Sequence, residues 1–370
     1  MARTRIVIVG GGYAGAALAP ALEEHADVIL VEARECFVHN VAAIRGVVDP
    51  DVLSRAVLPY GRLLKRGKVI HDRVVALGDS GVRLANGDEI EADIVVVATG
   101  SSYAQPFKPA GDSVADFLAS SRQAHELLQT ARSVAIAGAG AVGAELAGEI
   151  ATKMPDKSVT LVTPANALFP DYQPGFGRKL DAQLRELGVV VRYGVTAALT
   201  QNSGPYSGDL AIQGGEAIAS DLVFPATGAR AVVELFKPLL GVAFDRLGRV
   251  QVDSWLRPAG RSRLFALGDA VATGDAMTIV GIHRQAAWLI KTLRAVLGGT
   301  EADALPQYAA WPMPPILIPF GPKKGASILP ITRKGLIVGA HVTSALKGKD
   351  LFIPRYRKDF GHGQAAEAAA

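Results

Sequence analysis

Two copies of one glycine-rich pattern constrain this chain more than any other feature of its sequence. The stretch RIVIVGGGYAGAALAPAL contains an apolar run, a glycine cluster and a helix-forming segment, and RSVAIAGAGAVGAELAGEI repeats that order. Each copy matches G-x-G-x-x-G, the pattern of a strand–turn–helix unit that binds a dinucleotide. The glycines of the two copies are Gly10, Gly12 and Gly15, and Gly138, Gly140 and Gly143. One match alone is weakly specific, whereas two complete copies predict a chain that binds two dinucleotides.

Each glycine of the pattern has its own physical role. The first permits a tight turn, the second lets a pyrophosphate approach the backbone, and the third lets the helix pack closely on the strand. The phosphates then lie at the helix N-terminus, where free N–H groups and the helix dipole favour negative charge. The next strand of the first unit, DVILVE, ends at Glu32. A carboxylate roughly 20 residues beyond the first glycine is placed to bind a ribose 2′-hydroxyl.

The second unit lacks this carboxylate. Its corresponding strand, SVTLVT, ends at Thr163. No acid is therefore present there to bind a 2′-hydroxyl or to repel a 2′-phosphate, and no arginine follows directly to bind that phosphate. The sequence leaves the choice between NADH and NADPH open.

Three further apolar runs end in glycine turns. DIVVVATG ends at Gly100 and DLVFPATG at Gly228, and each closes one dinucleotide unit. RLFALGDA ends in Gly268 and Asp269. An acid at this position can accept hydrogen bonds from ribityl or ribose hydroxyls, and the alternative is a plain Gly-Asp turn.

A long amphipathic helix is predicted after this turn. Its apolar residues recur at nearly 3.6-residue spacing and the segment stops at Gly298. The N-terminus of this helix, near Met277, would stabilise negative charge on a reduced flavin, because helix starts attract anions. The same periodicity would arise in any core helix.

The composition excludes several kinds of protein. With 49% hydrophobic and 20% charged residues in 370, the chain has a globular composition. Cys36 is the single cysteine, which excludes a disulfide framework and a cysteine-based metal site. No cluster of metal-ligand spacing appears, so no metal is expected. Arg3 and Arg5 precede an uncharged run, as in a secretory signal, but the fixed glycine spacing favours the strand–turn–helix alternative.

The excess positive charge is confined to the C-terminal part. From Pro306 to Ala370 the sequence has nine Lys and Arg against three Asp and Glu, whereas the whole chain has a net charge of +4. Such asymmetry suits an anionic partner, including a membrane surface, and a simply solvated basic face is the equal alternative. Two short apolar segments around GPKKG predict a hairpin in this region.

These residues resemble the two-dinucleotide-domain flavoproteins, in which a first Rossmann unit binds FAD and an inserted second unit binds NAD(P)H. The resemblance covers nearly the whole chain. Within that class the sequence is most similar to the apoptosis-inducing-factor-like, ferroptosis-suppressor group of NAD(P)H:quinone oxidoreductases. The similarity depends on FVHNVAAIRG, GAGAVGAELAGEI, MTIVGIH and KGKDLF.

The resemblance implies an α/β fold with two Rossmann-like domains and a small C-terminal α+β unit. The NAD(P)H-binding domain is inserted in the FAD-binding domain. The expected ranges are 1–105 and 226–305 for the FAD-binding domain, 106–225 for the NAD(P)H-binding domain, and 306–370 for a C-terminal acceptor or interface domain.

The resemblance also implies site residues. In this group the segment from Cys36 to Gly46 carries no cysteine pair, and its arginine contributes to the FAD site. The expected FAD-binding residues are Gly10, Gly11, Gly12, Tyr13 and Ala14 around the pyrophosphate, Glu32 at the ribose, Val74 at the adenine through its main chain, Asn40 and Arg45 at the flavin, and Asp269 at the ribityl chain. We treat Cys36 itself as incidental.

Three residues are predicted to act in catalysis. Glu145 matches an acid that such domains place near the nicotinamide, and Lys108 matches a lysine near the flavin. His39 lies in the same stretch as Asn40, and a hydrogen-bonded core histidine is an equal alternative to a catalytic role. For Lys108 the alternative is a solvated lysine in a proline-rich linker.

The predicted function is hydride transfer from NADH or NADPH to FAD, followed by transfer of two electrons to a quinone. The alternatives are a ferredoxin reductase and a nucleic-acid-binding death effector, and no nucleic acid is expected because no recognised motif accompanies the basic excess.

Animal members of the group begin with a myristoylatable glycine, whereas this chain begins Met1-Ala2. We therefore expect a cytoplasmic protein whose membrane contact, if made, is peripheral and uses the basic C-terminal segment. Aromatic residues of that segment would suit an interfacial surface, a quinone-access wall, a homodimer face or a domain core.

Overall fold

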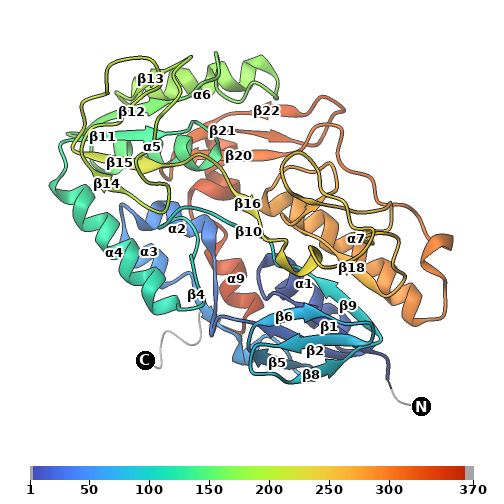
Figure 1. The fold of residues 1–370 in the computed structure, drawn as a ribbon. Helices are drawn as coiled ribbons and strands as arrows, with labels where there is room; N and C mark the ends of the chain where they lie inside the picture. Colours follow the sequence, from blue (N-terminus) through green and yellow to red (C-terminus); the bar gives the residue numbers. More distant parts are fainter. Residues whose placement is uncertain (1–2, 363–370) are drawn as a thin grey trace.

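Two parallel sheets dominate the computed structural model, which describes residues 3–362 (Figure 1). The first sheet has the order β18-β9-β1-β2-β5, and all its neighbouring strands are parallel. Its strands are β1 (Arg5–Val9), β2 (Asp27–Glu32), β5 (Lys68–His71), β9 (Ile94–Val97) and β18 (Leu264–Ala266). The central strands are almost purely aliphatic because helices or a second sheet cover both of their faces.

One face of this sheet carries the helices α1 (Tyr13–Leu22) and α7 (Ile279–Leu297). The other face packs against a small antiparallel sheet of β6 (Val74–Leu77), β7 (Gly81–Leu84) and β8 (Glu89–Glu91). Helix α7 ends at the predicted Gly298, which is its C-cap residue. Its apolar stripe includes Ala286, Leu289 and Leu293, all buried in the same cluster as the strands.

The second sheet has the order β13-β12-β11-β15-β14. Its strands are β11 (Ser133–Ala137), β12 (Ser158–Val162), β13 (Val190–Arg192), β14 (Tyr206–Ser207) and β15 (Leu222–Pro225), with only β14 antiparallel to its neighbour. Helices α4 (Val114–Thr130), α5 (Ala141–Lys153) and α6 (Pro174–Glu186) contribute to the core on the sheet. The order β12-β11-β15 repeats the order β2-β1-β9 of the first sheet, as expected for two copies of one unit.

Two crossing segments connect the sheets. Strand β10 (Ser101–Ser102) leaves the first sheet and pairs antiparallel with β16 (Arg230–Ala231), which returns from the second. Strand β18 then pairs with β9 and completes the first sheet. The predicted α/β class, with one Rossmann-like unit nested inside the other, is confirmed. The expected domain limits at residues 105, 225 and 305 remain predictions.

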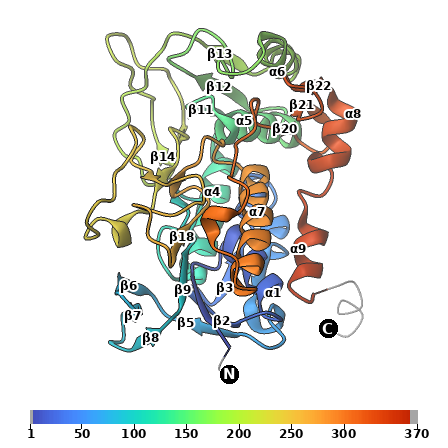
Figure 2. The same cartoon turned by 90° about the vertical axis from the view of Figure 1, so that its right-hand side faces the viewer.

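The C-terminal unit contains the predicted hairpin. Strands β20 (Ile316–Phe320) and β21 (Lys324–Leu329) pair antiparallel, and β22 (Leu336–Val338) continues the sheet. Helix α8 (Ala340–Thr343), the π-helical turn η4 (Ser344–Gly348) and α9 (Ile353–Asp359) follow. Figure 2 shows this unit running down one side of the molecule, from the second sheet at the top to the first at the bottom.

The packing of the C-terminal unit joins the two cores. Phe320 is fully buried in the core of the second sheet, and Tyr356 and Phe360 are buried in that of the first. At Gly148 of α5 an added Cβ would lie 2.4 Å from the Phe320 ring, so the glycine makes room for it. These three aromatic residues are therefore core residues, which was one of the predicted alternatives. Trp311 and Phe352 are only partly buried.

Short elements complete the chain. They are β3 (Cys36–Val38), α2 (Asn40–Gly46), α3 (Pro50–Ser54), β4 (Val57–Pro59), η1 (Tyr60–Arg62), η2 (Glu234–Phe236), β17 (Val250–Gln251), β19 (Val271–Ala272) and η3 (Ala302–Ala304). Among residues 3–362, no helix combines the length and the apolar character that a membrane crossing requires.

Candidate functional site

The first glycine turn is shaped by close approach of the backbone. Gly10 has a φ of +104°, and a Cβ there would lie 2.5 Å from the carbonyl oxygen of Ala98. A Cβ on Gly15 would lie 1.9 Å from the oxygen of Gly10. A Cβ on Gly12 would meet nothing within 4 Å. The outer glycines are thus required by the protein itself, whereas the middle one faces open space at the start of α1, where a pyrophosphate would bind.

The second glycine turn repeats this geometry. Gly138 has a φ of +112°, and a Cβ there would lie 2.3 Å from the carbonyl oxygen of Ala226. A Cβ on Gly143 would lie 1.8 Å from the oxygen of Gly138, and one on Gly140 would again meet nothing within 4 Å. Both turns therefore present an open cradle at a helix N-terminus. The predicted glycines at the strand ends, Gly100, Gly228 and Gly268, also have positive φ and open space beside the Cα atom.

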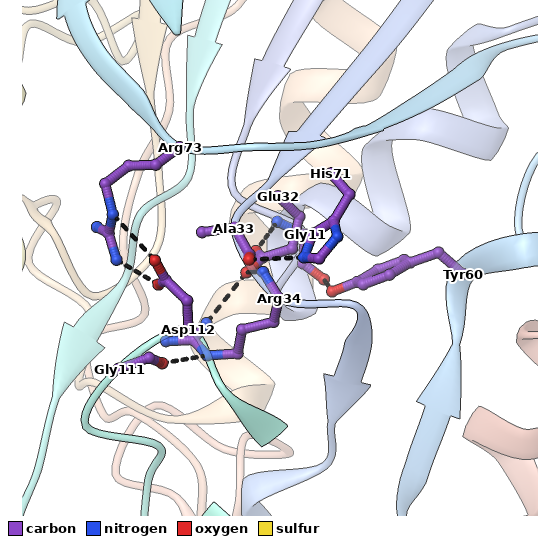
Figure 3. A network of polar contacts seen from close by, with 9 residues as sticks. All are labelled: Gly11, Glu32, Ala33, Arg34, Tyr60, His71, Arg73, Gly111 and Asp112. Carbon is purple, nitrogen blue, oxygen red and sulfur yellow. Dashed lines mark hydrogen bonds and ion pairs between the residues drawn. The ribbon is translucent and has the colours of Figure 1, made fainter. Parts of the chain in front are cut away.

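Glu32 lies beside the first cradle, as the spacing predicted (Figure 3). Its Oε2 accepts a hydrogen bond of 2.6 Å from the N–H of Gly11, and its Oε1 accepts two from Arg34. The hydroxyl of Tyr60 donates to the oxygen of Gly11, 2.8 Å away. These bonds fix the glycine loop relative to the end of β2. Val74, the expected main-chain contact of the adenine, begins β6 at the same edge of the sheet and is buried.

A second polar pair closes this edge. Arg73 and Asp112 form an ion pair, and Arg34 donates through Nε to the oxygen of Gly111 at 3.1 Å. Figure 3 shows both contacts joining the end of the first sheet to the segment that leads into α4. The segment around residue 111 is thereby held over the ribose side of the cradle.

A cavity of about 170 Å3 lies where the two sheets and the C-terminal unit meet. Residues from all three regions line it: Tyr13, Asn40, Val41, Ile44, Tyr103, Phe107, Lys108, Val142, Glu145, Asp269, Met277, Ile279, Ile282, Ile316, Leu317, Ile318, Lys347 and Phe352. Most of these side chains are apolar, and a few polar groups converge among them. This composition is typical of a small-molecule site.

Two oxygens in this cavity have no hydrogen-bond partner. Oδ1 of Asp269 and Oδ1 of Asn40 are both buried and unpaired within residues 3–362. The other carboxylate oxygen of Asp269 accepts from Ser101 at 2.6 Å and from Lys108 at 3.2 Å. A buried polar atom without a partner is costly. The orphaned oxygens therefore fit a group with hydroxyl and N–H donors, such as FAD would supply.

The predicted Lys108 reaches this cavity. Its Nζ contacts Ser101 and forms an ion pair with Asp269, and its side chain is 23% exposed. It is therefore a partly buried, paired lysine rather than a solvated one.

Glu145 is held by a residue that the sequence did not single out. Its Oε1 lies 2.7 Å from Nζ of Lys347, which also donates to the oxygen of Leu317 at 3.1 Å. Burial raises the pKa of the Glu145 carboxyl, and the Lys347 ammonium opposes that rise. Both side chains line the cavity, so the pair presents a charged, hydrogen-bonding edge within an otherwise apolar wall. The motif KGKDLF, which carries part of the resemblance, was the available signal for Lys347.

Arg45 is paired with an acid of α5. Its guanidinium makes a bidentate ion pair with Glu149 of α5, with N–O distances of 2.8 and 3.0 Å. It does not line the cavity, although Ile44 beside it does. The buried pair joins α2 to α5, and a flavin contact by Arg45 stays a prediction.

His39 is buried behind the cavity wall. Its Nε2 lies 2.6 Å from the oxygen of Leu351, which can only accept, so Nε2 carries the proton. Nδ1 then accepts a hydrogen bond of 2.9 Å from the Tyr13 hydroxyl. Burial lowers the pKa of His39 to about 4. The histidine is thus neutral and does not reach the cavity, which matches the predicted alternative of a hydrogen-bonded core residue more closely than a catalytic one.

The start of α7 lies at the opposite side of the cavity. Oγ1 of Thr278 caps the helix by accepting from the N–H of Gly281 at 3.2 Å, and Met277 and Ile279 line the cavity. Gln285 of the same helix accepts from the N–H of Gly268 at 2.7 Å. These contacts position the predicted helix N-terminus and the Gly268-Asp269 turn together.

Cys36 does not contribute to this site. Cys36 lies on β3, outside the residues that line the cavity, and burial raises the pKa of its thiol. A protonated thiol is a poor nucleophile. Within the part of the chain that the structure describes, no group of three potential ligand residues could hold a metal ion.

The structure brings an arginine close to the end of β12. Thr163 donates its backbone N–H to the oxygen of Arg192 at 3.0 Å, because β13 pairs with β12. The Arg192 side chain is exposed and has no acidic partner among residues 3–362. The Arg192 backbone therefore lies beside the position at which the first unit has Glu32, although no arginine follows Thr163 in the sequence.

Comparisons with known proteins agree with this geometry. The family model described as pyridine nucleotide-disulphide oxidoreductase matches residues 4–286. Apoptosis-inducing factor homolog B of Dictyostelium discoideum is 28% identical over 376 residues, covering 96% of each chain. Ferroptosis suppressor protein 1 of Xenopus laevis is 26% identical over 377 residues, again covering 96% of each chain. The predicted resemblance is thereby confirmed.

Solved structures agree in fold. NDH2 from Plasmodium falciparum, solved in complex with NADH, superimposes with a TM-score of 0.73 at 14% identity and covers 97% of each chain. A ferredoxin reductase from Rhodopseudomonas palustris has a TM-score of 0.63 at 20% identity, covering 84% of this chain and 79% of its own.

Proposed function

The chain belongs to the pyridine nucleotide-disulphide oxidoreductase family, and from that premise we propose that it is an NAD(P)H:quinone oxidoreductase. It is an oxidoreductase with FAD and NAD(P)H as its cofactors. When bound, FAD accepts a hydride from the nicotinamide and releases two electrons to an acceptor. The proposal concerns the acceptor and the residues that serve it.

One observation carries the proposal. Apolar residues of α2 and β20 line the cavity together with the Glu145–Lys347 pair. The single cysteine lies outside it, so electrons cannot leave through a thiol pair. An apolar wall that ends in a hydrogen-bonding pair suits a flat, neutral acceptor with polar carbonyl oxygens. A quinone has those properties.

The residues of the site have distinct proposed roles. The two glycine cradles bind the two pyrophosphates, and Glu32 orients the ribose of the first dinucleotide. Asp269 and Asn40 accept hydrogen bonds through their orphaned oxygens. Lys108 neutralises Asp269 and fixes its orientation.

The Glu145–Lys347 pair is proposed to serve the acceptor. Reduction of a quinone to a quinol takes up two electrons and two protons. The Lys347 ammonium has three donor hydrogens, of which the bonds to Glu145 and Leu317 use two. The third can donate to a quinone oxygen as negative charge develops on it. Glu145 holds the ammonium in that orientation.

Rapid mixing under anaerobic conditions tests the proposal. The FAD-loaded protein is reduced with one equivalent of NADH or NADPH and then mixed with menadione or a short-chain ubiquinone. Quinone should reoxidise the flavin much faster than buffer alone, and the Lys347→Met variant should lose most of that acceleration while retaining reduction by nicotinamide. Equal reoxidation with and without quinone would exclude a quinone as the acceptor.

A ferredoxin is the second candidate acceptor. The nine basic residues against three acidic ones after residue 305 would attract an acidic protein. In that case reoxidation by a ferredoxin should be fast and should slow steeply with added salt, whereas quinone reduction should be nearly independent of salt.

We further propose peripheral membrane contact through the C-terminal unit. Val342 and Leu346 lie four residues apart and are each 41% exposed, and Ile331 is 68% exposed beside the exposed cations Arg333 and Lys334. Apolar side chains flanked by cations suit the surface of an anionic membrane. Flotation with anionic vesicles tests this, and Ile331→Glu should reduce binding.

A further inference from the structure

A second cavity lies outside the candidate site. It has a volume of about 560 Å3 and is formed by α2 and α3 on one side and by the segment from Lys349 to His362 on the other. Figure 2 shows α9 on the opposite side of the molecule from β6–β8. No residue of the glycine cradles lines it.

The charge of this cavity is strongly one-sided. Its lining includes five cations, Arg45, Arg55, Lys349, Arg357 and Lys358, against the single acid Asp350. Asp350 is already engaged, because its Oδ1 accepts from the N–H of Phe352 at 2.9 Å. Arg45 is neutralised by its ion pair with Glu149, and the remaining cations around one hollow would favour a bound anion.

Several donors in the cavity are not used by the protein. The Nζ atoms of Lys349 and Lys358 have no ion-pair or side-chain hydrogen-bond partner among residues 3–362. Nε2 of His362 is buried and also lacks a partner in that range. Arg45 binds Glu149 through Nε and Nη2, which leaves Nη1 as its remaining donor group. Lys349 and Lys358 are exposed, so the buried Nε2 of His362 is the atom whose lack of a partner within residues 3–362 points to an absent ligand.

The remaining wall is apolar. Val52, Leu351, Ile353 and Pro354 line one part of the cavity. A free inorganic ion would use only the cations, whereas a phosphate ester with an organic group would use both parts. The volume is also within the range of sites for small organic molecules.

We infer that this cavity binds a phosphate monoester through Lys349, Lys358 and His362, with its organic group against the apolar wall. Arginine and lysine side chains are the usual ligands of phosphate oxygens. The phosphate group can belong to a soluble metabolite or to a lipid headgroup, since the recognition chemistry is the same. The inference is independent of the proposed quinone reductase activity, because it uses no residue of the cavity lined by Asp269 and Glu145, which we call the flavin cavity.

The two cavities share a thin wall. Leu351 lines the basic cavity and Phe352 lines the flavin cavity, and both have left-handed backbone conformations, with φ of +55° and +64°. In the same way, Arg45 lines the basic cavity and its neighbour Ile44 lines the flavin cavity. A ligand in the basic cavity would therefore restrain the turn that carries Phe352.

Calorimetric titration of the FAD-loaded protein, with saturating NAD+ present to fill the nucleotide site, tests the inference. The probes are phenyl phosphate, inorganic phosphate, and phosphatidylcholine vesicles with or without phosphatidic acid. Phenyl phosphate should bind more tightly than inorganic phosphate because it also uses the apolar wall. The double variant Lys349→Gln/Lys358→Gln should weaken binding by at least about tenfold, because two charge-assisted contacts are lost.

The matched control is Lys68→Gln/Lys291→Gln, which removes two exposed lysines elsewhere on the surface. It should bind phenyl phosphate like the unchanged protein. Binding of phenyl phosphate identifies a soluble ester as the ligand, and binding only of vesicles with phosphatidic acid identifies a lipid headgroup. Binding that both double variants weaken equally, or no binding of any probe at millimolar concentration, would overturn the inference.

Discussion

Removal of Lys347 should destabilise the protein in a way that depends on pH. Lys347 and Glu145 lie 2.7 Å apart, and their side chains are only 10% and 5% exposed. In Lys347→Met the carboxylate of Glu145 stays buried without its partner, and Glu149 adds repulsion. Breaking a buried pair from one side costs about 3–5 kcal/mol. We expect a loss of that order in the free energy of unfolding at pH 8.

The sign of the pH dependence follows from the Glu145 carboxyl. Without Lys347 its pKa in the folded protein rises further above the unfolded value, because the ammonium that opposed the rise is gone. A carboxyl with a raised pKa keeps its proton in the folded state, so stability falls as pH rises above about 4.3. The deficit of Lys347→Met should therefore be small near pH 5 and largest at pH 8. Glu145→Gln in the same chain should restore most of the loss.

Lys324 offers a matched control on the surface. It lies 2.7 Å from Glu186, the same distance, but the two side chains are 32% and 66% exposed. Lys324→Met should change the unfolding free energy by less than about 1 kcal/mol at either pH. The measurement is urea unfolding followed by circular dichroism, with excess FAD in every sample. Equal losses for Lys347→Met and Lys324→Met, or a loss for Lys347→Met that is the same at pH 5 and pH 8, would refute the reasoning.

Three further predictions concern single residues. Glu145→Gln should slow reoxidation of the reduced flavin by menadione by about tenfold, equal to roughly 1.4 kcal/mol, while FAD stays bound, because the amide no longer holds the Lys347 ammonium toward the acceptor; an unchanged rate in stopped-flow would remove Glu145 from the site. Arg192→Gln should weaken binding of NADPH and of 2′,5′-ADP by about tenfold or more and leave NADH unaffected, because a charge-assisted contact to the 2′-phosphate is lost; equal effects on both nucleotides in calorimetry would contradict this. His39 has a folded pKa of about 4, below its unfolded value of 6.5, so the unfolded state binds its proton first and stability should fall by roughly 3 kcal/mol as pH drops from 7 to 4. His39→Gln should lose less over that range, and identical pH profiles for both proteins would count against the assignment.

The parts of the site that depend on local backbone geometry could be predicted from the sequence. Gly10 and Gly138 adopt the positive φ that the fingerprint requires, and Glu32 lies beside the first cradle. Asp269 reaches the cavity because the turn after β18 places it there. In each case the strand, turn and acid belong to one short strand–turn–helix–strand unit or to one turn, so the spacing alone determines their arrangement.

The parts that depend on contacts between distant segments could not be predicted. Lys347 meets Glu145 only because β20 packs on α5 and η4 packs on β20. Arg192 lies beside Thr163 only through the pairing of β13 with β12. Arg45 turns to Glu149, and nothing in its own segment indicates which of two cavities its side chain faces. Partners that lie far apart in sequence leave no periodic or spacing signal.

The bond between His39 and the oxygen of Leu351 spans 312 positions of the chain. Synthesis proceeds from the N-terminus, at a rate of about 5–20 residues per second. The first sheet is complete only after β18 has been synthesised. His39, which is bonded to Tyr13, gains its hydrogen bond to the Leu351 oxygen later still. The cavity wall therefore closes only after Lys347 and Phe352 have left the ribosome. A nascent chain that bound its nucleotides at the two glycine turns would still lack these two residues of the cavity wall.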